Sequence, residues 1–392
     1  MEMLVIIYRE KGAFTHMETF KDLHKKIQEA SLSDQDNGTP VKDLFEDFDK
    51  SQLNCLFTPD IHPVFWNLEA CVTKATDSGV KISKDVQACM ESLHGKKKLA
   101  YALIAPAFIG QFSDEVTPGM LRNAFKQMGF DGMVEVAVFA DILTLKEALE
   151  FDQNINSESD YQLTSCCCPM WIAMIRKIYS DLMPHVPATV SPMIAAGRTV
   201  KILHPDALTV FIGPCVAKKA EAKEPDLKGA IDHVLTFQET KELFDLLNVD
   251  LTLFAANEKE NSSKAGRIYA RVGGVSEAVK NTVERLNPNR KIAIKTRQAD
   301  GVVNCKAMVN ELVSGQVTAN FFEGMGCVGG CVGGPKSILD KDIAKDNVNT
   351  YGEKAIYPTP IDNPYVIELL HRLGFDTPES LVEDNKFFTR KF

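Results

Sequence analysis

Two cysteines lie in a glycine-rich stretch near the C-terminal end of the chain. Cys327 and Cys331 are four positions apart within residues 322–334, a stretch that contains six glycines. Glycine at this density disfavours a regular helix or strand, because each glycine loses much backbone entropy on folding. It is typical of backbone that turns sharply or passes close to a bound group. The two thiols therefore indicate either a metal centre or a tight turn with buried structural cysteines.

Two other segments place cysteine beside proline, each at the expected end of a strand. Residues 166–169 read Cys-Cys-Cys-Pro, and Cys215 follows Pro214. One cysteine from each segment, added to the two in the glycine-rich stretch, gives the four thiolates that a [4Fe–4S] cluster requires. Six of the ten cysteines fall in these three groups. This distribution indicates metal binding in a reducing cytoplasm rather than a disulfide framework.

Three segments together resemble the signature motifs of the [FeFe]-hydrogenases. They are residues 164–171 (TSCCCPMW), 213–221 (GPCVAKKAE) and 322–334, in the family's order and with its approximate spacing. The resemblance covers roughly residues 97–340. It implies reversible hydrogen oxidation and proton reduction at an H-cluster, a [4Fe–4S] cube bridged by cysteine to a diiron subsite with CO, cyanide and azadithiolate ligands. It also implies ferredoxin or a similar electron carrier, and hydrogenase maturation proteins, as partners.

The resemblance assigns roles to individual residues of these motifs. Lys218 would donate a charge-assisted hydrogen bond to a cyanide ligand, and Met325 would pack against the diiron subsite. Cys331 would bridge the cube to that subsite. The implied cube ligands are Cys168, Cys215, Cys327 and Cys331, and the implied cofactor-binding residues are Ala105, Pro106, Ala107, Ser191, Lys218, Tyr269 and Met325.

The first motif can be aligned in two ways, because it has three cysteines where the family has two. Counting back from Pro169 makes Cys168 the cube ligand and Cys167 the proton-relay thiol. Counting from the start of the motif makes Cys167 the ligand and Cys166 the relay thiol. We prefer the first alignment, because Trp171 and the helix behind it fix that end of the motif.

Proton transfer to a buried cluster requires titratable groups between the cluster and the surface. Glu147 and Glu150 lie three residues apart on one face of an expected helix, and they align with the relay glutamates of the family. Cys167 would be the inner end of this relay. Without the resemblance, the same pair would indicate only a solvated helix face. A relay serine of the family falls at Pro187, which cannot carry a proton, so Thr189 or water would substitute or the path would differ.

Other departures from the family pattern reduce the polar groups and the bulk around the diiron subsite. They are Gly213, Ala107 and Met193, where well-studied relatives have methionine, serine and glutamine. These changes imply altered redox tuning and slower turnover, as in the divergent and sometimes sensory branches of the family. A hydrogen-sensing regulator with low turnover is therefore the first alternative function.

A second alternative is a hydrogenase-like iron–sulfur assembly protein, which keeps the cube ligands but lacks the diiron site. Such proteins also carry an N-terminal set of ferredoxin-like cysteines. Here Cys55, Cys71 and Cys89 are too far apart in the sequence for a ferredoxin motif and are expected to be structural. Lys218, Met325 and the two glutamates also favour the enzyme.

The cysteine loops must be held by a chain in which strands and helices alternate. This order predicts two lobes of mostly parallel sheets flanked by helices, with the metal cluster between them at the carboxyl ends of the strands. A small, mostly helical N-terminal region (1–95) would precede the catalytic domain (96–392). We expect strands over 99–105, 133–138, 208–212, 231–235, 292–296 and 317–322. We expect helices over 20–30, 41–48, 117–128, 141–152, 169–182, 239–247, 305–314 and 364–374, and another that begins at Ser191–Pro192. Asp141 would cap the helix over 141–152, and residues 341–354 would form a polar loop.

The overall composition is typical of a globular protein. The chain has 392 residues, of which 45% are hydrophobic and 25% charged, enough for two or three domain-sized units. Its net charge of −9 argues against nucleic acid and anionic membranes as partners. The apolar run 99–109 is too short to span a bilayer, and residues 1–8 show no secretory signal. We therefore expect a cytoplasmic protein.

Overall fold

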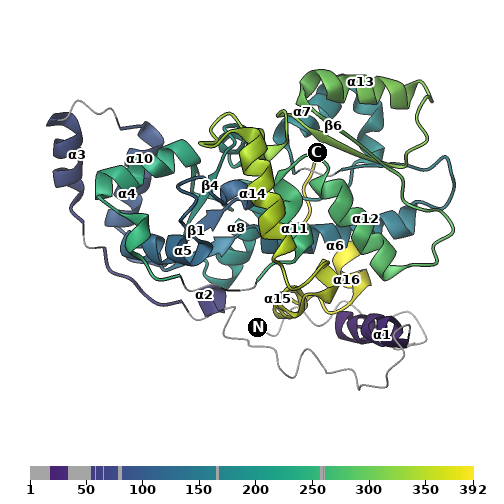
Figure 1. Cartoon of the computed structure of the whole chain (residues 1–392), viewed down its shortest axis with the longest axis horizontal. Coiled ribbons are helices and arrows are strands. Elements are labelled where there is room, and N and C mark those ends of the chain that lie inside the picture. Colours follow the sequence, from purple (N-terminus) through teal and green to yellow (C-terminus); the bar gives the residue numbers. More distant parts are fainter. Residues whose placement is uncertain are drawn as a thin grey trace.

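Two parallel sheets form the frame of the molecule (Figure 1), and this confirms the predicted fold class. The computed structural model describes residues 18–33, 54–57, 59–64, 66–77, 82–164, 167–256, 259 and 261–392. The first sheet has the order β2-β1-β4-β5 and contains β1 (Ala100–Ile104), β2 (Gly132–Glu135), β4 (Leu208–Gly213) and β5 (His233–Thr236). The second has the order β3-β7-β6 and contains β3 (Gln162–Leu163), β6 (Thr296–Asp300) and β7 (Phe321–Met325).

The central strands β1 and β7 are buried because helices cover them, and β1 is apolar throughout whereas β7 contains Glu323. All five residues of β1 are buried, as are all five of β7. β1 pairs in parallel with β2 on one side and with β4 on the other. A strand buried on both faces has no polar side to display, so its sequence is a continuous apolar run.

Helices pack against both sheets. The first sheet contacts α4 (Lys84–His94), α5 (Pro118–Gln127), α8 (Pro192–Leu203), α9 (Ala217–Glu221) and α10 (Phe237–Leu247), and the second contacts α7 (Pro169–Ile178), α12 (Gly274–Leu286) and α13 (Gly301–Val313). Helix α2 (Asn54–Phe57) also contacts the first sheet, through β2. The remaining helices are α1 (Phe20–Ser33), α3 (Leu68–Asp77), α6 (Ala137–Asn154), α11 (Lys264–Arg267), α14 (Lys341–Glu353), α15 (Pro364–Arg372) and α16 (Pro378–Val382).

Helix α6 lies between the two lobes. It packs against α8, which covers the first sheet, and against α12, which covers the second. Its 18 residues are buried over most of their length, including the charged Asp141, Lys146 and Glu147. A charged side chain in such a position needs a specific partner, because isolated charges are costly to bury. The helix therefore both joins the lobes and carries titratable groups into the interior.

The start of α6 corrects two of our predictions. The strand expected over 133–138 ends at Glu135, and the helix begins at Ala137 instead of near Asp141. Asp141 is consequently not a helix cap. Its buried carboxylate accepts hydrogen bonds from the Ser263 amide (2.6 Å) and hydroxyl (2.5 Å) and from the Gly266 amide (2.8 Å). Asp141 thus fixes α11 to α6.

Two further predictions were wrong in the C-terminal half. The polar segment 341–354, expected as a loop, forms α14, because Ala344, Val348 and Gly352 recur every fourth residue and form a narrow buried face. The strand expected over 292–296 lies instead at β6, with two exposed residues at a sheet edge. Its apolar run around Ile294 packs into the core just before the strand.

Several remaining elements differ from expectation only at their ends. The helix expected over 169–182 stops at Ile178 and continues as a 3₁₀ turn over Ser180–His185. Strand β7 begins a few residues later than predicted, whereas α5 begins where expected, with the Thr117 hydroxyl accepting a hydrogen bond from the Met120 amide. The helix expected over 41–48 lies outside the described residues.

The described part of the N-terminal region packs on the rest of the protein. Val86, Met90 and Leu93 of α4 are buried in the same core as β1. His24 of α1 lies 2.6 Å from the carbonyl oxygen of Ile361 through its Nδ1. The division of the chain at residue 95 stays a prediction. No helix among the described residues is long and apolar enough to cross a membrane.

Asp141 gives a prediction about stability and pH. Burial raises the pKa of this carboxyl from 3.8 to about 7, although the hydrogen bonds from Ser263 and Gly266 oppose the rise. A folded-state pKa above the unfolded value contributes stability at low pH that is lost as the pH rises. We expect the free energy of unfolding to fall between about pH 4 and pH 7, and Asp141→Asn to remove this part of the slope.

Urea unfolding of the metal-free protein across this pH range measures the slope. Asp250→Asn is the control, because hydrogen bonds from Thr252 lower the pKa of the exposed Asp250 carboxyl. That variant should keep the wild-type slope above pH 4.5. If the Asp141→Asn and wild-type slopes were parallel, Asp141 would not titrate in this range.

Candidate metal centre

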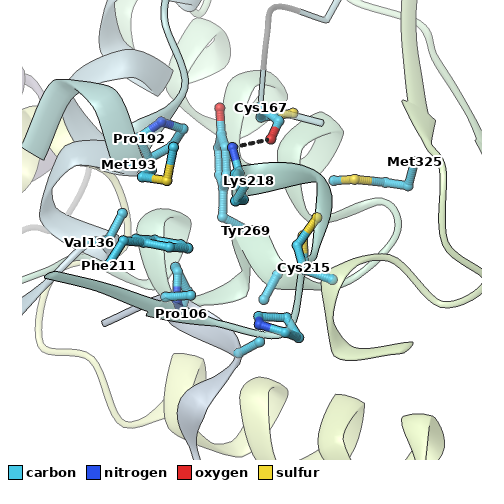
Figure 2. Close-up of a pocket in the computed structure, with 15 residues that line it drawn as sticks. Pro106, Val136, Cys167, Pro192, Met193, Phe211, Cys215, Lys218, Tyr269 and Met325 are labelled. Carbon is cyan, nitrogen blue, oxygen red and sulfur yellow. Dashed lines mark hydrogen bonds between the residues drawn. The ribbon is translucent and has the colours of Figure 1, made fainter. Parts of the chain in front are cut away.

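The carboxyl ends of strands from both sheets meet at one cavity (Figure 2). The first sheet contributes the residues that follow β1, β2 and β4, and the second contributes the end of β7 and the loop after β3. The open volume is about 60 Å³. The walls are Ala105, Pro106, Ala107, Val136, Cys167, Pro192, Met193, Phe211, Pro214, Cys215, Lys218, Tyr269, Ala270, Met325 and Cys331.

Four of the predicted cysteines come together at one side of this cavity. The Gly326 amide donates a hydrogen bond to the Cys168 sulfur at 3.3 Å. Burial, and then the neighbouring thiols of Cys168 and Cys215, raise the pKa of Cys327 to about 11 and that of Cys331 still further. Within the described residues, no three potential ligands converge tightly enough to hold a single metal ion. Four separate thiols around a space suit a cluster, in which each thiolate binds a different iron.

Close backbone packing explains the glycines of the third motif. Gly329 and Gly330 have φ of +84° and +87°, a conformation that glycine adopts most readily. A Cβ at Gly330 would lie 2.6 Å from the Val272 nitrogen. The Gly329 amide donates to Asp300 at 2.6 Å, and its carbonyl accepts from the Val272 amide at 2.9 Å. The loop is thus held by its own backbone groups, which leaves the cysteine side chains free to bind a group.

A second close approach places Cys168 beside this loop. A Cβ at Gly324 would lie 1.9 Å from the Trp171 ring, and one at Gly326 would lie 2.5 Å from the Met170 Cβ. Trp171 belongs to α7, which begins directly after Cys168. Helix α7 therefore packs against the bare backbone of β7 and the loop that leads to Cys327.

Lys218 brings a cation to the cavity wall. Its Nζ donates to the Glu221 carboxylate at 2.7 Å. It also donates to the Cys167 carbonyl oxygen at 3.1 Å (Figure 2). Burial by itself would lower the pKa of Lys218, but the Glu221 carboxylate and the thiols of Cys215 and Cys331 raise it above its usual value. The sequence analysis missed Glu221, although its spacing of three from Lys218 on one helix could have suggested the pair.

Cys215 lies where α9 begins. The backbone amides of Lys218 and Ala217 donate toward its sulfur. Burial raises the pKa of the Cys215 thiol, whereas these amides and the Lys218 ammonium oppose the rise. The same groups would stabilise a thiolate bound to metal.

Cys167 and Glu147 lie close together at the inner end of the predicted relay. Burial raises the pKa of Cys167 well above its usual value, and Cys168 and Glu147 raise it further. Burial and Glu147 likewise raise the pKa of Tyr269. The nearby Thr144 hydroxyl opposes the rise in the Tyr269 pKa. The hydroxyls of Thr144 and Tyr269 nevertheless have no hydrogen-bond partner of normal geometry among the described residues. Glu147 itself is fully buried.

Glu150 lies one turn further along α6, away from the metal-site cavity. Burial raises the pKa of its carboxyl, and the Lys146 ammonium at 3.2 Å opposes the rise. Its side chain is 15% exposed and lines a second pocket, which also contains Pro187. Glu150, Glu147 and Cys167 thus follow one another from a surface pocket to the metal-site cavity.

Some of the predicted residues lie elsewhere or cannot be described. Ser191 is buried at the start of α8, but Pro192 and Met193, not Ser191, form the cavity wall. Thr189 is also buried, and its hydroxyl has no hydrogen-bond partner among the described residues. Cys166 lies outside the described residues. Cys89 packs in the core with β1 and is not among the residues that line the cavity.

Glu323 is a buried anchor that the sequence analysis did not identify. It accepts hydrogen bonds from the Gly273 amide (2.8 Å) and from the amide (2.7 Å) and hydroxyl (2.6 Å) of Ser276, at the N-terminus of α12. A carboxylate at this end of a helix is favoured by the helix dipole. Its sequence signal is one charge inside the apolar strand β7.

Comparison with known proteins identifies relatives of this site. A model of the family "Iron only hydrogenase large subunit, C-terminal domain" matches residues 98–335. Iron hydrogenase 1 of Clostridium pasteurianum is 26% identical over 316 residues, which is 68% of this chain and 55% of that protein. This chain therefore spans about half the length of that relative.

Two other comparisons bear on fold and function. A cytosolic Fe-S cluster assembly factor NAR1 homolog of Schizosaccharomyces japonicus is 27% identical over 151 residues, 31% of this chain and 29% of that protein. A solved structure of a variant of [FeFe]-hydrogenase HydA1 from Chlamydomonas reinhardtii superposes with a TM-score of 0.63 at 22% identity, covering 79% of this chain and 98% of that one. At that identity, the superposition shows the shared fold.

The contact between Gly324 and Trp171 gives a prediction. Gly324→Ala should lower the free energy of unfolding by about 1–3 kcal/mol, because the added methyl group overlaps the indole ring and must push α7 from β7. Urea unfolding measures this change. Gly95→Ala is the control, since its nearest neighbour is the Glu91 carbonyl oxygen at 3.3 Å. Equal stabilities for the two variants would mean that the Trp171 contact does not constrain α7.

Proposed function

This chain belongs to the family of iron-only hydrogenase large subunits, and on that premise we propose that it catalyses reversible hydrogen oxidation and proton reduction at an H-cluster. The observation that carries the proposal is the single cavity at which thiols from three separated motifs meet a buried ammonium and a buried relay thiol. A structural role for the cysteines would not require Lys218 to be buried beside them.

The donor set suits the proposed cofactor. Cys168, Cys215, Cys327 and Cys331 would hold a [4Fe–4S] cube, and Cys331, which lines the cavity, would bridge it to a diiron subsite. When bound, the cluster would supply the redox chemistry, with electrons exchanged at the cube and hydrogen formed or split at the diiron subsite. The cavity is small for such a group at about 60 Å³, and the unbranched side chains of Met193 and Met325 are walls that can move to admit it.

The rest of the chain would position protons and exclude water. Apolar walls around Lys218 keep the ammonium in a low-dielectric setting, where its hydrogen bonds are stronger than in water. Cys167 would give protons to the cavity and receive them from Glu147. Glu150 would reload Glu147 from the outer side of α6, directly or through water.

Electrons would enter on the other side of the site. Met170, Val216 and Val328 each lie within two residues of a proposed cube ligand and are 47%, 43% and 55% exposed. The cube would therefore lie under a thin apolar cover. We assign this surface to docking of ferredoxin or a similar carrier, and delivery of the diiron subsite to the hydrogenase maturation proteins.

Two other functions would give different experimental results from the proposed enzyme. An assembly protein is favoured by the match to the NAR1 homolog, which covers 31% of this chain. It would hold iron–sulfur clusters without a diiron subsite, and the burial of Lys218 and Glu147 would then have no use. A hydrogen-sensing regulator would share the whole site and differ in turnover.

The decisive test is infrared spectroscopy of the protein matured with its diiron subsite, together with a hydrogen-evolution assay. We expect bands of metal-bound CO and cyanide, and hydrogen evolution from a chemical reductant. Cys331→Ala should abolish both, whereas Cys71→Ser, at a thiol outside the cavity walls, should keep both. A loaded cube without these bands would favour the assembly protein, and bands with negligible turnover would favour the sensor.

The proposed relay gives a second test. Glu147→Gln keeps the shape of the side chain but cannot ionise, so turnover should fall by about 10²-fold or more while cluster loading stays intact. Cys167→Ala should have the same effect. Hydrogen evolution normalised to the infrared bands measures both, with the exposed Glu115→Gln as control. Wild-type rates in both relay variants would contradict this route.

A further inference from the structure

A second pocket opens beside the outer end of the proposed relay. Its volume is 390 Å³, and none of the three cysteine motifs contributes to it. Its walls come from the end of α6, from the residues around β3 and from the turn that precedes α8. Polar side chains of Glu150, Asp160, Gln162 and His185 line it. A polar space of this size has room for several waters.

One carboxylate oxygen at this pocket lacks a protein partner. The Oε1 atom of Glu150 pairs with the Lys146 ammonium at 3.2 Å, whereas Oε2 is buried and has no hydrogen-bond partner among the described residues. The Lys146 ammonium is fixed in turn by the carbonyl oxygens of Leu381 (2.8 Å) and Val382 (3.1 Å). Because these carbonyl oxygens fix the Lys146 ammonium, the ion pair fixes Glu150 Oε1 and leaves Oε2 without a protein partner among the described residues. Buried oxygens of this kind are normally satisfied by water.

The ring of His185 is held at the same pocket in one orientation, which fixes its tautomer. Its Nδ1 lies 3.2 Å from the Tyr161 carbonyl oxygen, and its ring stacks on the Tyr161 ring at 4.0 Å. A carbonyl oxygen only accepts, so Nδ1 must carry the hydrogen and donate it. In the neutral ring Nε2 is therefore the basic nitrogen. No hydrogen bond joins Nε2 to any residue in the part of the chain that the structure describes.

Several charged side chains lie around the pocket. Asp160 lies close to His185: the amides of Asn156 and Ser157 are the main cause that lowers the Asp160 pKa, and His185 contributes. The other titratable groups that face the pocket or act on Glu150 are Tyr161, Glu150, Lys146 and Asp384.

The turn also contains Pro187, the position at which the resemblance expects a proton-carrying serine. Proline has no group that can accept or donate a proton, and it lines this pocket together with His185. Two residues away, the imidazole of His185 offers Nε2, a nitrogen that accepts a proton.

We propose that the pocket formed by Glu150, Asp160, Tyr161, Gln162, His185 and Pro187 is the port through which protons are exchanged with solvent, and that His185 is the exchanging group. This inference rests on the proposed function. His185 Nε2 takes a proton from solvent and releases it to pocket water, and that water delivers it to Glu150 Oε2. The direction reverses when hydrogen is oxidised.

The first experiment is chemical rescue in the matured holoenzyme. His185→Gln can still donate to the Tyr161 carbonyl but carries no protons, so hydrogen evolution should fall by about tenfold or more, most strongly above pH 7. His185→Ala should fall similarly, and free imidazole should restore much of its rate by occupying the pocket. The infrared bands report that the cluster is intact.

His371→Ala is the matched control, because this histidine is exposed and pairs with Asp376 away from the pocket. It should keep the wild-type rate and not respond to imidazole. A wild-type pH profile in His185→Gln, or a loss in His185→Ala that imidazole does not reverse, would overturn the proposal. Absence of hydrogen evolution in the wild-type holoenzyme would instead contradict the proposed function.

The second experiment needs no activity. Histidine-selective nuclear magnetic resonance of the metal-free protein follows the charge on His185 as the pH changes. If the two groups share the pocket, Glu150→Gln removes a nearby negative charge and should move the midpoint of the His185 signal to lower pH. Superimposable curves in the wild type and Glu150→Gln would show that the two groups do not interact, and would overturn the port even if the protein is a hydrogenase.

Discussion

The close approach of the glycine-rich loop to both lobes is the constraint on which the rest of the site depends. A Cβ at Gly334 would lie 2.7 Å from Pro214 at the end of β4, and one at Gly330 would lie 2.6 Å from the Val272 nitrogen before α12. The Lys336 amide adds a hydrogen bond to the Pro214 carbonyl oxygen at 3.1 Å. A side chain at either glycine would push the loop outward and separate Cys331 from Cys215.

This packing creates a buried cavity with mostly apolar walls, and the burial sets its electrostatics. The thiols have raised pKa values because burial disfavours their anions, and metal binding would replace the lost protons with cationic charge. A buried ammonium is tolerated because Lys218 pairs with Glu221. The site thus suits a bound group whose positive metal ions compensate the negative thiolates. Without such a group, ionised thiols in this cavity would be unfavourable.

In the proposed function, helix α6 would couple the architecture to proton supply. Joining the lobes requires a helix that is buried on most sides, and such a helix reaches from the cavity to the surface in 18 residues. The same burial that holds the lobes together encloses Lys146 and Glu147, and the next turn carries Glu150 to the second pocket. Residues that join the lobes and residues of the proposed relay therefore lie on one element.

The sequence by itself determined the alternating strands and helices and identified the candidate cysteine ligands and relay residues, because cysteine groups and apolar runs are local patterns. It failed for α14, whose buried face is only Ala344, Val348 and Gly352, and for Asp141, which binds α11 and does not cap α6. The partners Glu221 and Glu323, and the pocket that joins His185 to Glu150, were decided only by the tertiary structure. The role of each of these side chains depends on contacts that form on folding. Local periodicity in the sequence contains no information about such contacts.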